Sequence, residues 1–141
     1  METLVDTLHN GNHSLVVCIG NTICVYDGRG VSDLYRLLHE TPAILNNAKV
    51  ADKVVGKGAA ALMILANVIE VYADVISKQA LELLQRCNVK ATYSALVPYI
   101  INRAGTGMCP LEQKCFSCLT AEECETKIDE FIEELKHKRS I

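Results

Sequence analysis

A segment rich in glycine and lysine, Asp52-Lys53-Val54-Val55-Gly56-Lys57-Gly58, precedes the most apolar helix that the sequence predicts. Glycines let a backbone approach a ligand closely, and the free N–H groups at a helix N-terminus bind anions. Lys53 and Lys57 would add positive charge. The segment matches neither the Walker spacing GxxxxGK[ST] nor the dinucleotide pattern GxGxxG. Two interpretations therefore stay open: an anion site, or a loop that packs tightly against a sheet with its lysines in solvent.

A second segment, residues 102–112, combines Arg103, Thr106, two glycines and a cysteine. Its proline suits the first position of a helix, which makes Cys109 the cap, where free N–H groups and the helix dipole stabilise a thiolate. Arg103 could reinforce that effect or bind a phosphate or carboxylate. Glu112, three residues beyond the cysteine, could accept or donate protons. The segment predicts a reactive thiol or an anion site, and the alternative is a loop followed by a capped helical turn.

Four cysteines near the C-terminus follow the pattern C-x5-C-x2-C-x5-C, formed by Cys109, Cys115, Cys118 and Cys124. Four thiolates could hold zinc tetrahedrally or carry an iron–sulfur cluster. The spacing is that of neither a zinc ribbon nor a ferredoxin, and Cys124 falls inside a predicted helix, which restricts its direction. A metal site is therefore the less favoured interpretation of these four thiols.

Composition narrows the class of protein. The chain has 141 residues, of which 50% are hydrophobic and 22% charged, with a net charge of −3. This predicts a single domain over residues 1–141, with a core at about 12–113 and a cysteine-containing helical extension at about 114–141. The charge pattern has no basic stripe, so nucleic acid is not an expected partner. The most apolar run, residues 59–69, is too short for a bilayer, and no membrane role is expected.

The number of cysteines and the N-terminal residues indicate the cellular compartment. Seven cysteines, an odd number, do not suggest a disulfide framework. Residues 1–13 contain Glu2 and Asp6 and lack the layout of a signal peptide. We expect free thiols and a cytoplasmic location.

Hydrophobic periodicity predicts the elements that must position these residues. Two β-rich runs, 13–19 and 22–26, flank Gly20-Asn21, which indicates a hairpin. Helical and extended patterns then alternate: helices at 32–39, 59–66 and 77–87, strands at 49–52, 69–76 and 89–93, and a final helix that begins with a Thr120/Glu123 capping box. This order predicts a three-layer α/β/α fold whose mixed sheet begins with a β-hairpin.

Two stretches carry a resemblance: Ala51-Asp-Lys-Val-Val-Gly-Lys-Gly-Ala-Ala-Ala61, and Leu96-Val-Pro-Tyr-Ile-Ile-Asn-Arg103 continued by Thr106-Gly-Met-Cys-Pro-Leu-Glu112. Over about residues 12–113 the chain resembles a small prokaryotic family of unknown function that is classed with the cytidine-deaminase-like superfamily. The tail from Gln113 is not expected to belong to the resemblance. The resemblance implies a three-layer α/β/α domain.

Zinc-dependent deamination does not follow from the resemblance. It needs a His or Cys with a Glu at one helix start and Pro-Cys-x-x-Cys at the next. Here the two helix starts carry Gly56-Lys57-Gly58 and Ser77-Lys78-Gln79-Ala80, which cannot ligate zinc in that way. Cys115-x-x-Cys118 follows the last predicted strand. No conventional deaminase zinc site is therefore expected.

In this fold the ligand sits where the two helix starts meet the sheet edge, and the resemblance implies a pocket there. The leading hypothesis is binding of a small anionic, nucleotide-like metabolite by Asp52, Lys53, Gly56, Lys57 and Gly58, with the Arg103–Cys109 loop and Thr106 folded over it. Asp52 could orient a base or a ribose hydroxyl. Two alternatives stay open, and with them whether the protein is an enzyme.

The first alternative is a cysteine-dependent enzyme, with Cys109 as nucleophile and Glu112 or Asp52 as proton carrier. The second is a metal-binding or protein-interaction module that uses the C-terminal cysteines and the final helix. A homodimer is compatible with the apolar excess, although nothing in the sequence fixes it.

Overall fold

The structure is a computed structural model that describes residues 1–139. Its elements, in chain order, are α1 (Glu2–Asn10), β1 (Leu15–Ile19), β2 (Thr22–Tyr26), α2 (Ser32–Glu40), the 3₁₀ helix η1 (Pro42–Ile44), β3 (Lys49–Val55), α3 (Lys57–Leu65), β4 (Glu70–Ser77), α4 (Lys78–Arg86), β5 (Lys90–Val97), α5 (Pro110–Lys114) and α6 (Ala121–Arg139).

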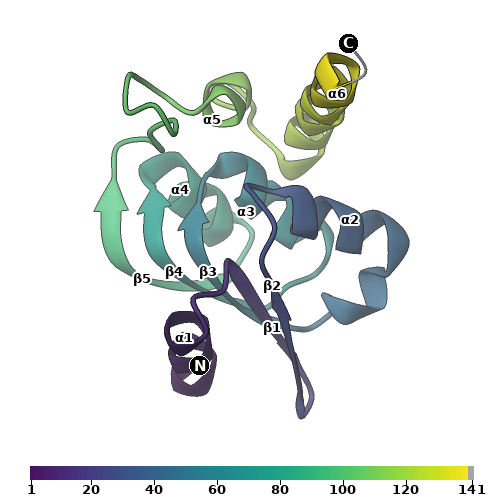
Figure 1. The fold of residues 1–141 in the computed structure, drawn as a ribbon, viewed down its shortest axis with the longest axis vertical. Coiled ribbons are helices and arrows are strands. Elements are labelled where there is room, and N and C mark those ends of the chain that lie inside the picture. Colours follow the sequence, from purple (N-terminus) through teal and green to yellow (C-terminus); the bar gives the residue numbers. More distant parts are fainter. Residues whose placement is uncertain (140–141) are drawn as a thin grey trace.

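The strands of the described residues form one five-stranded mixed sheet in the order β2-β1-β3-β4-β5. The β1–β2 hairpin and the β1–β3 pair are antiparallel, whereas β3, β4 and β5 run parallel. Helix α1 lies on one face of the sheet and α2, α3 and α4 lie on the other, as Figure 1 shows. The structure therefore confirms a three-layer α/β arrangement with a mixed sheet that begins with a hairpin.

Helix α3 lies at the centre of the core. Every residue from Lys57 to Met63 is buried, including Ala59, Ala60 and Ala61. Small side chains on all sides of the helix let the sheet, α4 and α6 pack closely around it. Its lack of a polar face predicts this burial from sequence alone.

In β3 and β4 the regular alternation of inward and outward side chains is interrupted at the same level of the sheet. In β3 the core residues are Val50 and Val55, and in β4 they are Val71, Ala73 and Ile76. A regular strand would bury residues two apart throughout. At this level Lys53 and Asp74 turn toward the α1 face, where each contacts a residue of the N-terminal segment.

The C-terminal segment is part of the main core. Cys115, Cys118, Ala121, Cys124 and Ile128 pack in the same buried cluster as α3 and the sheet. In Figure 1, α5 and α6 lie beyond the C-terminal ends of the parallel strands. The buried core of the structure thus extends past residue 113, because thiol and alanine side chains in this segment cover α3.

Two helix starts carry side-chain caps. The Ser77 side chain caps α4 by accepting a hydrogen bond from the Ala80 N–H at 3.2 Å. Thr120 accepts from the Glu123 N–H at 3.1 Å, and the Glu123 carboxylate reaches back to the Leu119 N–H at 2.6 Å. Between residues 1 and 139, no helix combines the length and the apolar character needed to cross a membrane.

Candidate functional site

The two segments singled out by sequence meet at the C-terminal edge of the parallel strands, and the Glu112 carboxylate lies between them. Glu112 is 2% exposed. Its Oε1 accepts hydrogen bonds from the Lys57 backbone N–H at 2.8 Å, the Ser77 hydroxyl at 3.2 Å and the Gln79 amide at 2.5 Å. Its Oε2 accepts from the Ile100 N–H at 2.8 Å. The anion at the N-terminus of α3 is therefore supplied by the chain itself.

The glycines of the first segment serve close packing against α5. A Cβ at Gly58 would lie 2.8 Å from Leu111 Cδ2, and a Cβ at Gly56 would lie 3.4 Å from Glu112 Oε1 and 3.3 Å from Ile100 Cγ1. Leu111 and Glu112 thus fill the space that an external anion would need at this helix start. The structure supports the tight-packing interpretation of Gly56 and Gly58.

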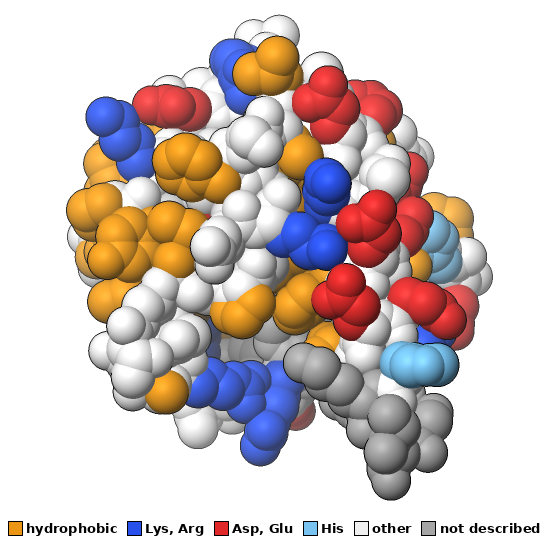
Figure 2. Space-filling view, turned by 90° about the horizontal axis from the view of Figure 1, so that it is seen from above, with side chains coloured by type: hydrophobic (Ala, Val, Ile, Leu, Met, Phe, Trp, Pro, Cys, Tyr) orange, Lys and Arg blue, Asp and Glu red, His pale blue; other side chains and the backbone are white. Residues whose placement is uncertain are grey.

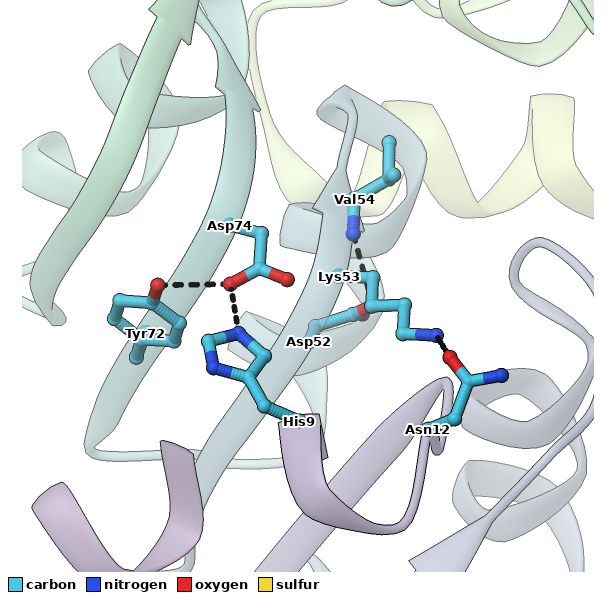
Figure 3. A network of polar contacts seen from close by, with 7 residues as sticks. All are labelled: His9, Asn12, Asp52, Lys53, Val54, Tyr72 and Asp74. Atoms are coloured by element: carbon cyan, nitrogen blue, oxygen red, sulfur yellow. Dashed lines mark hydrogen bonds and ion pairs between the residues drawn. The ribbon is translucent and has the colours of Figure 1, made fainter. Parts of the chain in front are cut away.

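The lysines of this segment are both engaged within the chain. Lys57 is only 5% exposed, and its ammonium donates to the Phe116 carbonyl at 3.1 Å and to the Cys118 carbonyl. This side chain fastens the segment after α5 to the start of α3. Lys53 points the other way and donates to the Asn12 side-chain oxygen at 2.5 Å, as Figure 3 shows. The two cations therefore do not face a common hollow.

Asp52 also lies apart from the Glu112 site. It is nearly buried, and its carboxylate accepts a hydrogen bond from the Val54 N–H at 3.3 Å. Burial raises the pKa of the Asp52 carboxyl to about 7, although hydrogen bonds from the backbone oppose the shift and nearby Asp74 reinforces it. The Asp52 carboxyl therefore titrates near neutral pH.

The loop after β5 does not fold over the Glu112 site with its polar side chains. Arg103 and Thr106 are exposed, and Thr106 is held by Asn102, which accepts from its N–H at 3.0 Å and donates to its hydroxyl at 3.1 Å. Cys109 is the N-cap residue of α5, but its side chain makes no capping hydrogen bond. Since Glu112 is committed to four donors, the predicted Cys109–Glu112 catalytic pair gains no geometric support.

Three of the four C-terminal cysteines lie near one another beside the Lys57 ammonium. A hydrogen bond from Cys124 lowers the pKa of the Cys115 thiol, and the Lys57 charge acts in the same direction. The same contact raises the pKa of the Cys124 thiol, and burial raises that of Cys118. Within residues 1–139, no three or more His, Cys, Asp or Glu side chains are arranged to hold a metal ion, so the geometry does not support the four-cysteine metal site.

A second polar cluster ties α1 to the sheet, and sequence reasoning missed it. Asp74 Oδ1 lies 2.7 Å from His9 Nε2 and accepts a hydrogen bond from the Tyr72 hydroxyl at 2.8 Å, as Figure 3 shows. Burial and the contact with Asp74 raise the pKa of the Tyr72 hydroxyl. The Tyr-x-Asp spacing, which puts two polar side chains on one face of a strand, was the available signal. These contacts join α1 to β4, so the effect of the cluster is to hold α1 in place.

An open groove lies beside the Glu112 site, between α4 and the segment that follows α5. Its volume is about 720 Å³. It is lined by Lys57, Gln79, Glu82, Gln85, Arg86 and residues 116–119. Of the predicted ligand-binding residues, Lys57 alone lines it. Gln79, Arg86 and Phe116 had no signal in the sequence, because they stand in no motif.

Comparisons with known proteins agree with this architecture. A family model described as a domain of unknown function (DUF1893) matches residues 3–132. The crystal structure of a DUF1893 family protein (TM1506) from Thermotoga maritima, at 2.70 Å resolution, is similar with a TM-score of 0.79 and 26% identity, covering 87% of this chain and 83% of that one. Comparison with curated proteins gives no match.

The match corrects the limits of the expected resemblance, since the family pattern includes most of the C-terminal segment, in agreement with its place in the core. With its family model covering nearly the whole chain, this protein belongs to the DUF1893 family, a family of domains of unknown function.

Proposed function

We propose that the groove between α4 and residues 116–119 binds a small, nucleotide-like anionic metabolite. The observation that carries the proposal is an open hollow of about 720 Å³ that begins where α3 and α4 start, at the carboxyl ends of β3 and β4, and extends along α4 to Arg86. In open α/β sheets, ligands bind in crevices outside the carboxyl ends of the strands. A cytidine-deaminase-like fold would place its ligand at this same edge of the sheet. We include that fold assignment in the proposal.

The lining supplies three kinds of contact. Phe116 is 59% exposed and offers a ring face for a planar base. Arg86 is exposed at the end of α4 and offers a guanidinium to a phosphate or carboxylate. The third contact comes from Gln79. Its amide NH₂ group donates to both the Glu112 side chain and the Glu112 carbonyl, which fixes the orientation of the amide. The Gln79 Oε1 is left buried without a hydrogen-bond partner.

The Glu112 and Lys57 interactions fix the elements around the groove. They hold the start of α3, the start of α4 and the segment after α5 in fixed positions. Cys118 also lines the groove, but burial raises the pKa of its thiol and keeps it protonated at neutral pH. Binding is therefore better supported than cysteine-dependent catalysis. All seven cysteines are free, which supports a reducing, cytoplasmic location.

The test is a panel of nucleoside mono-, di- and triphosphates and free bases, measured by thermal shift and then by isothermal titration calorimetry. Arg86→Ala should weaken binding of the phosphorylated compounds, and Phe116→Ala should weaken binding of all compounds that carry a base. Arg103→Ala is the matched control, because Arg103 is also exposed but lies outside the groove. If no member of the panel stabilises the wild-type protein, or if Arg103→Ala weakens binding as much as Arg86→Ala, the proposal is wrong.

A further inference from the structure

The outer edge of β5 is unpaired in the described chain. β5 is the last strand in the sheet order, and its hydrogen-bonded neighbour is β4 alone. Alternate N–H and C=O groups along Lys90–Val97 therefore point away from the sheet. Such an edge is a template for pairing with another strand.

This edge lacks the features by which proteins usually prevent pairing. Residues 91–97 read Ala-Thr-Tyr-Ser-Ala-Leu-Val and contain no charged residue, proline or glycine. Lys90, at the start of the strand, is the sole charge on it. Natural edge strands are commonly protected by inward charges, prolines, bulges or short length.

β5 is also much more exposed than a parallel strand normally is. Residues 92–96 are all exposed, with Tyr93 at 42% and Leu96 at 46%, whereas β4, which has the same length, has no exposed residue. Parallel sheets occur almost exclusively where both faces are covered.

The apolar surface continues into the segment after the strand, where Tyr99 is exposed and Ile101 is 60% exposed. In Figure 2, hydrophobic side chains gather on the left of the molecule, the side on which β5 lies in Figure 1.

We propose that a second copy of this chain covers this surface by pairing its own β5 antiparallel with the first, which would join the two sheets into one. Two copies related by a twofold axis contact each other through the same residues, and a strand that pairs with itself about such an axis is necessarily antiparallel. Directly opposite residues of an antiparallel pair lie on the same face of the sheet, so the axis must pass at a residue. With the axis at Ser94, Ala91 of each copy lies opposite Val97 of the other.

The charges of the strand fit this occupant. In the antiparallel arrangement the two Lys90 ammonium groups lie at opposite ends of the interface, and no like charges face each other between residues 91 and 97. Each Lys90 lies 3.9 Å from Glu70 of its own chain, which offsets its charge. Residues 91–97 therefore bring no charge repulsion to a pairing of this strand with its own copy.

The exposed area is of the size that a second copy would use. Tyr93, Leu96, Tyr99 and Ile101 together expose on the order of 400 Å² per copy, about half of the ~800 Å² per partner in a standard interface. The paired backbone edge and the small side chains of β5 would supply much of the remainder. The opposite edge, β2, has five residues and belongs to an antiparallel hairpin, which tolerates a solvated face.

The test is the mass of the full-length protein by light scattering and sedimentation equilibrium across a wide range of concentration. The wild type should have twice the mass of the chain, and Leu96→Lys should halve that mass. Ile23→Lys is the matched control, because Ile23 is 43% exposed on the β2 edge, and it should stay dimeric. Ala95→Lys is a second β5 variant, and circular dichroism checks that each variant is folded.

Hydrogen exchange gives an independent readout. The amides of residues 90–97 should exchange more slowly as the protein concentration rises in the wild type, and should lose that dependence in Leu96→Lys. A wild type that stays monomeric, a dimer that survives both β5 lysine variants, or a dimer that Ile23→Lys dissociates while Leu96→Lys does not, would each overturn the proposal. A monomer would mean that another protein covers β5 or that the edge stays open.

Discussion

Replacing Glu112 with glutamine should destabilise the protein severely, because the carboxylate is the point on which four donors converge. The substitution keeps the shape of the side chain and removes its charge. If the amide oxygen takes the place of Oε1, the contacts to Lys57, Ser77 and Gln79 persist with a neutral acceptor, and the new NH₂ group meets the Ile100 N–H. The opposite orientation loses three acceptor contacts, so the first is the less costly.

The magnitude follows from these contacts. A buried donor left without its acceptor costs about 1–3 kcal/mol. The lost interaction between the carboxylate and the start of α3 adds about 0.3–2 kcal/mol. The expected loss in the free energy of unfolding is therefore about 3 kcal/mol, which is a large part of the ~5–15 kcal/mol typical of a folded domain. For a chain of this size it corresponds to a fall in Tm on the order of 10 °C.

The assay is urea and thermal denaturation of the wild type, Glu112→Gln and a matched glutamate variant. Glu130→Gln is the control, because Glu130 is half-exposed and pairs with Lys114 at 3.4 Å on the surface of α6. It should change the free energy of unfolding by less than about 0.5 kcal/mol. A Glu112→Gln protein within about 0.5 kcal/mol of the wild type would refute the reasoning, since it would mean that the four donors find water or other acceptors at little cost.

Three further predictions concern the neighbouring residues. Gly58→Ala should cost about 1–3 kcal/mol in unfolding experiments, because its Cβ would lie 2.8 Å from Leu111 Cδ2, whereas Gly107→Ala, with no atom within 4 Å, should cost far less. The raised pKa of Asp52, about 7, means that the native state holds a proton that the unfolded state releases, so stability should fall as the pH rises from about 4 to 7 and level off above it. Asp52→Asn should flatten that slope, and an unchanged slope would contradict the assignment. Lys57→Met should lower the Tm and increase proteolysis after α5, because Lys57 holds the carbonyls of that segment, and limited proteolysis followed by mass spectrometry checks where cleavage occurs.

Much of the fold could be predicted from local signals, because hydrophobic periodicity and caps act over a few residues. The hairpin around Gly20-Asn21, the buried alanine-rich helix and the Thr120/Glu123 capping box are all confirmed. Strand lengths were predicted less accurately. β3 was expected at 49–52 and is observed at Lys49–Val55, because glycines that pack against α5 resembled the end of a strand, and β5 was expected at 89–93 and is observed at Lys90–Val97.

The candidate site could be predicted only in its location. The sequence indicated that residues 52–58 and 102–112 matter, and the structure does bring Lys57 and Glu112 together across 55 residues of chain. It could not indicate that Glu112 faces inward or that Lys57 binds carbonyl groups, because those directions depend on the register of three separate elements. The groove had no sequence signal for the same reason, since Gln79, Arg86 and Phe116 come from two segments with no common motif.

The sequence by itself determined where helices and strands begin, which helix is central and which residues carry reactive groups, since each of these depends on neighbours within one or two turns of chain. Only the tertiary structure decided that the anion at the start of α3 is the protein's own carboxylate and that the cysteine-bearing segment belongs to the core. Both outcomes arise from packing between elements far apart in the chain, where burial makes an unpaired charge or donor too costly to leave without an internal partner.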